Sequence, residues 1–218
     1  NREYLRLREI ASKNYIYELM RIGVELTPFN TLGHIAGVHY VAMHAARQLE
    51  ALKVPDNLGN ISEAAAGHDI GKYGCKKSEE RRIPYLHYYY TDICFNRFNM
   101  PMIGHIAANH STWDLEIENL SVESLLLIYA DFRVRGKRAD DGREEMKICS
   151  LQEAGEVIFS KLYNMTTEKQ LRYRTVYTKL QDFEQMLVSS GVPTQIDVNA
   201  LTPVTRTDAS LRRTRRAV

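Results

Sequence analysis

Apolar residues recur at helical spacing along most of the chain. Between residues 34 and 53 they lie three and four positions apart, as one helix face requires: Val38, Val41, Ala42, Ala45, Leu49 and Leu52. Similar spacing predicts helices over 2–22, from about 60 to 68, 84–98, 101–110, 122–135, 150–163 and 167–190. No stretch alternates convincingly with a period of two, so no strand is expected. The pattern predicts an all-α fold.

Polar and glycine residues mark the ends of these helices. The expected N-caps are Asn60 or Ser62, Ser121, Ser150 (in a capping box with Glu153) and Thr166 or Thr167. Gly136 is expected to end the helix before it, and Gly191 the last one. Residues 137–145 are highly charged and are predicted to form a loop, and 76–82 a surface loop or an exposed helical turn.

The chain has 218 residues, of which 44% are hydrophobic, enough for one substantial core. We expect a single helical domain over 1–193. Residues 194–218 hold few apolar side chains and five arginines near their end, and are predicted to form a basic tail or linker.

The cellular setting follows from what the sequence lacks. No apolar run approaches the roughly 18 residues that span a bilayer, so no membrane association is expected. Three cysteines without CxxC spacing argue against a disulfide framework and favour a reducing cytoplasm. The chain begins at Asn1 rather than Met, which is consistent with a piece of a longer protein that has other domains.

Adjacent His68 and Asp69 follow a run of small residues and precede Ile70-Gly71-Lys72. An imidazole and a carboxylate on a core-facing segment need partners, because burying an unpaired polar group costs about 2–7 kcal/mol. A metal ion satisfies both groups at once. The alternative is an Asp that caps a turn beside a His at a helix end.

Other candidate ligands stand on either side of this pair. His39 precedes it, His87 and His110 follow, and Asp131 lies within the very apolar segment Tyr129–Phe132. Asp131 needs a partner there, either a cation or an ion pair with Arg133 or Arg135. The order along the chain is therefore His, His-Asp, His, His, Asp.

Over residues 30–135 this order resembles the HD-domain superfamily of metal-dependent phosphohydrolases. The resemblance implies a helical bundle, here with additional C-terminal helices, and a metal site made of His39, His68, Asp69 and Asp131. In two-metal members of the superfamily, further histidines bind the second ion and the Asp bridges both, which implies roles for His87, His110 and Asp69. It also implies that Lys72 contacts a phosphate oxygen. Arg133 and Arg135 are weaker candidates for that contact.

Imidazole and carboxylate ligands suit one or two Mn, Fe, Co, Ni or Zn ions better than Ca or Mg. Residues five apart on a helix point about 140° apart, so His105 competes with His110 and only one can face the site; we favour His110. The same spacing directs His34 and His44 away from a site that His39 faces.

The expected function is hydrolysis of a nucleotide or related small phosphorylated substrate by a metal-activated hydroxide, with Asp69 and Lys72 as catalytic residues. The GYP motif of cyclic-di-GMP phosphodiesterases and the Glu-Asp pair of (p)ppGpp hydrolases are missing. The alternative is a non-catalytic nucleotide-sensing or scaffolding module of a larger protein. The basic tail gives weak support for contact with nucleic acid.

Overall fold

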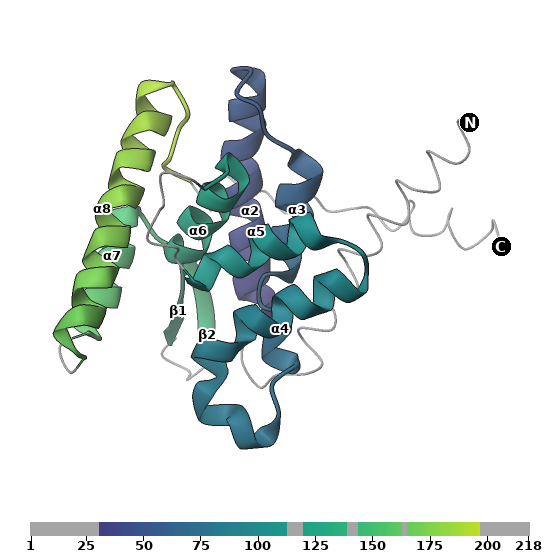
Figure 1. The fold of residues 1–218 in the computed structure, drawn as a ribbon. Coiled ribbons are helices and arrows are strands. Elements are labelled where there is room, and N and C mark those ends of the chain that lie inside the picture. The colour runs from purple at the N-terminus through teal and green to yellow at the C-terminus, as the bar shows by residue number, and fades with distance from the viewer. Residues whose placement is uncertain (1–30, 113–119, 139–143, 163–164, 197–218) are drawn as a thin grey trace, which may run out of the picture.

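The computed structural model describes residues 31–112, 120–138, 144–162 and 165–196 (Figure 1). The helix predicted over 2–22 lies outside these residues, as does the tail predicted over 194–218 apart from its first three residues. Those three form neither helix nor strand. The described part is predominantly helical, which confirms the all-α prediction.

Four helices enclose the main core. α2 (Thr31–Ala51) packs against α3 (Leu58–Gly67) and α6 (Val122–Arg133), and α5 (Pro101–Thr112) packs against both α3 and α6. The predicted stripe of α2 is buried at Val38, Val41, Ala42, Ala45 and Leu49, while Leu52 follows the helix end and is exposed. Removing this apolar surface from water is the main stabilising contribution.

Three of the predicted helix N-caps are found in the structure. Ser121, Ser150 and Thr166 cap α6, α7 and α8 as predicted, each accepting a hydrogen bond from a backbone N–H of the first turn. α3 begins earlier than predicted, because Asn57 is its N-cap and its side chain accepts from the Asn60 N–H.

A second layer contains α4 (Ile83–Arg97) and two short 3₁₀ helices, η1 (Ile70–Tyr73) and η2 (Lys77–Arg82). α4 packs along α5 and against η1. It appears below α5 in Figure 1. η2 is the exposed helical turn that was one of the two predictions for residues 76–82.

The charged segment after α6 is not simply a loop. α6 ends at Arg133, before Gly136, and the chain enters strand β1 (Val134–Arg138), which pairs antiparallel with β2 (Glu144–Ile148). The backbone register pairs Lys137 with Glu145 and Arg138 with Glu144. The prediction that 137–145 is a loop was therefore wrong at both ends, and residues 139–143 lie outside the described ranges.

The C-terminal helices are α7 (Leu151–Ser160) and α8 (Thr167–Ser189). α8 runs along one side of the molecule and contacts α7 and α6 (Figure 1). Gly191 follows it with a φ of 83°, a left-handed conformation that glycine adopts without strain, so the predicted stop is confirmed. Among the described residues no helix is both long and apolar enough to cross a bilayer.

Candidate metal centre

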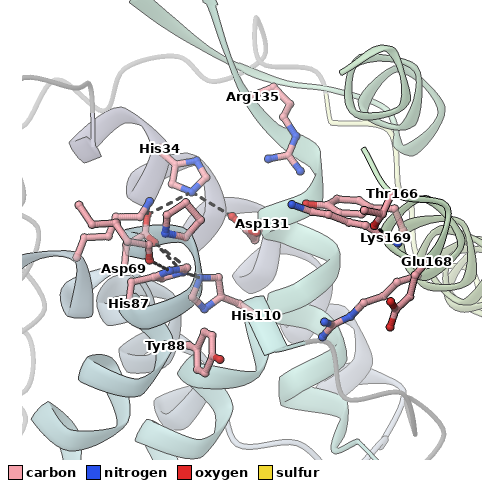
Figure 2. Close-up of a pocket in the computed structure, with 15 residues that line it drawn as sticks. His34, Asp69, His87, Tyr88, His110, Asp131, Arg135, Thr166, Glu168 and Lys169 are labelled. Atoms are coloured by element: carbon pink, nitrogen blue, oxygen red, sulfur yellow. Dashed lines mark hydrogen bonds and ion pairs between the residues drawn. The ribbon is translucent and has the colours of Figure 1, made fainter. Parts of the chain in front are cut away.

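Six ionisable side chains from distant parts of the sequence lie close together, and all of them except the fully buried His68 line one end of a cavity (Figure 2). They come from α2, the turn after α3, α4, α5 and α6. This histidine–aspartate cluster contains His34, His68, Asp69, His87, His110 and Asp131.

The turn that carries His68 and Asp69 is held tightly against α4. The Gly71 N–H donates to Thr91 Oγ1 at 3.0 Å, and that hydroxyl donates to the His68 carbonyl at 3.1 Å. A Cβ at position 71 would overlap the backbone carbonyl oxygen of His87. Only glycine allows η1 to approach α4 this closely, and the approach places Asp69 beside His87.

The two carboxylate oxygens of Asp69 face different histidines. Oδ2 lies 2.6 Å from Lys72 Nζ, 3.7 Å from His68 Nε2 and 3.8 Å from His34 Nε2. Oδ1 lies 3.7 Å from His110 Nε2 and 4.0 Å from His87 Nε2. Asp69 therefore stands between a His34–His68 half and a His87–His110 half of the cluster.

Asp131 completes the first half. Its Oδ1 lies 3.1 Å from His34 Nε2 and 3.9 Å from His68 Nε2. Two sets of ligand atoms each lie within 4.8 Å of one another: His34, His68 and Asp131 form one, and His68, Asp69 and His110 form the other. These buried and half-buried groups could hold a metal ion.

The histidines present their Nε2 atoms to one another. In three of them Nδ1 is within hydrogen-bond distance of a backbone carbonyl: His68 with Ala65 at 2.8 Å, His87 with Ile83 at 2.9 Å and His110 with Ala107 at 2.5 Å. A carbonyl accepts only, so Nδ1 carries the proton and the Nε2 lone pair faces the cluster. This is the orientation in which metal-binding histidines are usually held.

Pairs of these Nε2 atoms are close. His87 Nε2 lies 3.1 Å from His110 Nε2, and His68 Nε2 lies 3.3 Å from His34 Nε2. With both Nδ1 atoms protonated, the first pair brings two lone pairs together and can form no hydrogen bond. A shared cation converts this repulsion into coordination, so the donor set fits a metal ion.

The protonation states agree with this arrangement. Burial lowers the pKa of His68, His87 and His110, that of His110 to about 4, so these imidazoles are neutral at pH 7. Burial alone would raise the pKa of Asp69, but the neighbouring His68 and Lys72 outweigh it and hold the pKa below its ordinary value. Both donor types are therefore in the form that binds metal.

The structure does not bring His39, a predicted ligand, to the cluster. His39 Nε2 lies 2.8 Å from Ser62 Oγ of α3, and His39 lines a separate surface pocket with Tyr40 and Arg47. On α2 it is His34, predicted to point away, that lies in the cluster. The spacing argument that only one of the two can face the site was sound, but it was anchored on the wrong residue.

A signal for His34 was present in the sequence. His34 lies four residues before Val38 and seven before Val41, so it continues the buried stripe of α2. At 3.6 residues per turn it is about 40° from Val38, whereas His39 is about 100° away. The histidine on the stripe itself points into the protein.

The other predicted site residues separate into two groups. Lys72 and Arg135 line the cavity beside the cluster. Arg133 does not: it is buried on another side of α6, where Nε donates to the Cys149 carbonyl and Nη1 to the Tyr129 hydroxyl, both at 2.8 Å. Its predicted contact with substrate is therefore not supported.

On α5, His110 lies in the cluster while His105 is exposed and lies 3.4 Å from the Asn109 amide nitrogen. His44, on α2, lies outside the cluster, with Nε2 3.1 Å from the Pro193 carbonyl. Of His105 and His110, the structure therefore places in the cluster the one that we favoured, and His44 lies outside it as predicted.

The cavity extends from the cluster to α8 and has a volume of about 630 Å³. This is within the range of roughly 300–1,000 Å³ typical of small-molecule sites. The sequence did not predict that α8 lines the cavity, because a local pattern of residues does not indicate which distant helix packs beside a site. Its contribution consists of Thr166, Glu168, Lys169, Arg172 and Tyr173.

No protein family, no curated protein and no solved structure matches this chain. The chemistry of the site is therefore the basis for assigning a function. Buried imidazole and carboxylate ligands beside a lysine and a cavity of small-molecule size are suited to binding a metal ion together with an anionic ligand.

Proposed function

We propose that this chain is a metal-dependent phosphohydrolase of the HD type, acting on a nucleotide or related small phosphorylated substrate. The observation that carries the proposal is Asp69, whose two oxygens face two separate pairs of histidine Nε2 atoms. A carboxylate so placed is suited to bridging two cations. The order of ligands along the chain, with His34 in place of His39, still resembles that superfamily.

In this proposal His34, His68, Asp69 and Asp131 would hold one ion. His87 and His110 would hold a second ion on the other side of Asp69. Mn, Fe, Co, Ni or Zn would suit these ligands. Such an ion would supply Lewis-acid chemistry: it would polarise a phosphoryl oxygen and lower the pKa of a water molecule toward neutrality, which suits hydrolysis of a phosphoester.

Lys72 supplies positive charge beside the cluster. Burial alone lowers the pKa of Lys72, but the Asp69 carboxylate outweighs it and raises the pKa above its ordinary value. The ammonium is therefore charged at neutral pH. Its side chain is partly exposed and lines the cavity, where it is available to a phosphoryl oxygen as charge develops there.

The test compares two histidines of one helix. Wild-type protein, His34→Ala and His39→Ala are purified without chelator, their metal content is measured by elemental analysis, and hydrolysis of p-nitrophenyl phosphate and bis-p-nitrophenyl phosphate is followed with added Mn. We expect about one or two equivalents of transition metal in wild type and in His39→Ala, and a large loss of metal and hydrolysis in His34→Ala.

Wild-type protein that binds no Mn, Fe or Zn even on reconstitution would overturn the metal site. Protein that binds metal at His34 but hydrolyses neither ester nor any nucleotide in a broad screen would overturn the enzymatic assignment. It would then favour the nucleotide-sensing alternative.

A further inference from the structure

The cavity continues well beyond the metal ligands and Lys72. Its outer wall is formed by Arg135 on β1 and by the first turns of α8, and Figure 2 shows Arg135, Thr166, Glu168 and Lys169 across the cavity from His87 and Tyr88. A phosphate attacked at the cluster occupies only the inner end. Neither β1 nor α8 contributes a side chain to the histidine–aspartate cluster.

This outer wall is rich in positive charge. Arg135, Lys169 and Arg172 line it, against one acidic side chain, Glu168. Lys169 and Arg172 are three residues apart on α8 and share one face of the helix. Tyr173 follows on the same face, and Tyr88 of α4 also lines the cavity.

Arg135 gives an independent indication of a ligand. Its Nε is buried and has no hydrogen-bond partner in the described residues, where the two Asp56 carboxylate oxygens are the only other buried side-chain atoms in that state. Its Nη1 makes one long contact, 3.3 Å to the Val134 carbonyl, and the guanidinium lies 5.4 Å from the centre of the Phe132 ring. Leaving a buried charged donor unsatisfied is costly, and an anion in the cavity would remove that cost.

We propose that Arg135, Lys169 and Arg172 form a second anion subsite, which binds a phosphate group of the substrate other than the one attacked at the cluster. Guanidinium groups bind phosphate through paired, charge-assisted hydrogen bonds, so two arginines suit this role. The substrate is then a nucleotide with at least two phosphates, and its organic part lies between Tyr88 and Tyr173. The reaction rests on the function proposed above, whereas binding at this subsite does not.

The experiment compares adenosine 5′-monophosphate with adenosine 5′-diphosphate and adenosine 3′,5′-bisphosphate. The kcat/KM for each is measured with added Mn, and binding of each is measured by titration calorimetry with Ca in place of Mn. We expect the kcat/KM and the affinity of at least one of the two doubly phosphorylated compounds to exceed those of the monophosphate by about tenfold. The ratio should fall toward one in Arg135→Gln and Arg172→Gln.

Arg174→Gln is the matched control. Arg174 is on α8 too, but its guanidinium lies over the Phe159 ring, 5.4 Å from its centre, and it does not line the cavity. This variant removes the same charge from the same helix and should keep the wild-type ratio.

The proposal is overturned if the monophosphate has the same kcat/KM and affinity as both other compounds. It is also overturned if Arg174→Gln changes the ratio of doubly to singly phosphorylated compound as much as Arg172→Gln does. If no phosphoester at all is hydrolysed, the proposed function fails and the calorimetric ratio alone decides. A preference for the second phosphate that Arg172→Gln abolishes would then support the subsite without the reaction.

Discussion

Two residues of α6, Asp131 and Arg133, are two positions apart and belong to different kinds of polar environment. Around Arg133 every contact pairs a donor with an acceptor: Nε with the Cys149 carbonyl, Nη1 with the Tyr129 hydroxyl, and that hydroxyl with Glu184 Oε1 at 2.6 Å. Around Asp131 the neighbours are the Nε2 atoms of His34 and His68. Elsewhere in the same cluster, the Nε2 lone pairs of His87 and His110 face each other.

The difference separates a structural polar network from a cluster that could hold a metal ion. Among the described residues, no buried nitrogen of Arg133 lacks a hydrogen-bond partner, so this network stabilises the fold. The histidine–aspartate cluster brings like atoms together and leaves them to be satisfied by a cation. Burial and charge alone would not distinguish these two regions, but the matching of donors with acceptors does.

The largest effect expected in either region is on the cluster. Asp69→Asn keeps the size of the side chain but removes its charge and one of the oxygens that face the histidines. We expect loss of bound metal and a fall of at least about a thousandfold in kcat/KM for p-nitrophenyl phosphate, about 4 kcal/mol in activation free energy. Elemental analysis and initial rates measure this, with circular dichroism to check the fold. Full metal content in the variant would contradict the bridging role.

Removing Arg133 should affect stability and leave metal binding intact. Arg133→Ala leaves the Cys149 carbonyl without the Arg133 donor and removes the donor to the Tyr129 hydroxyl, which keeps only its bond to Glu184. We expect this to lower the free energy of unfolding by about 3–4 kcal/mol. Arg135→Ala, two residues further along, should cost less than about 1 kcal/mol. Urea unfolding measures both. A loss of metal in Arg133→Ala would erase the distinction between the two regions.

The smallest effect is a dependence of metal-free stability on pH. The folded pKa of His110 is about 4, below the ordinary 6.5, so between these values the unfolded chain binds the proton more strongly. Stability is therefore greatest above pH 6.5 and falls as the pH drops toward 4, by up to about 3 kcal/mol. The lowered pKa values of Asp69 and Asp131 act in a separate window, below pH 3.8.

Urea unfolding of chelator-treated protein at pH 7.5 and pH 5.0 tests this sign. His110→Gln should lose part of the pH dependence, and His105→Gln, on the exposed face of the same helix, should retain all of it. Equal behaviour of the two variants would mean that His110 is not buried in its neutral form.

Much of the fold was predictable because it depends on local signals. The buried stripe of α2 and the caps at Ser121, Ser150 and Thr166 act within one or two turns of helix. The β1–β2 hairpin was missed because the sequence of its strands is mostly charged and does not alternate with a period of two, whereas what joins them is the antiparallel pairing of their backbones from Val134–Ile148 to Arg138–Glu144. That pairing leaves no signal within either strand alone.

The site was predictable where one segment carries it and unpredictable where helices had to be oriented. His68, Asp69 and Lys72 lie within five consecutive positions, so their proximity required no tertiary information. Choosing between His34 and His39 required the rotation of α2 about its axis. The apolar stripe of α2 indicates that rotation, and it turns His34 rather than His39 toward the core. The approach of α8 depends on contacts with α6 and α7 and has no local signature.

The close approach of η1 to α4 also makes one backbone proton informative. The Gly71 N–H is bonded to Thr91 Oγ1 at a contact too tight for even a methyl group. Exchange of this proton with solvent deuterium requires the turn to separate from α4. Its exchange rate therefore reports how often the segment bearing His68 and Asp69 opens, and comparing that rate with and without metal would show how far the ion itself holds the turn closed.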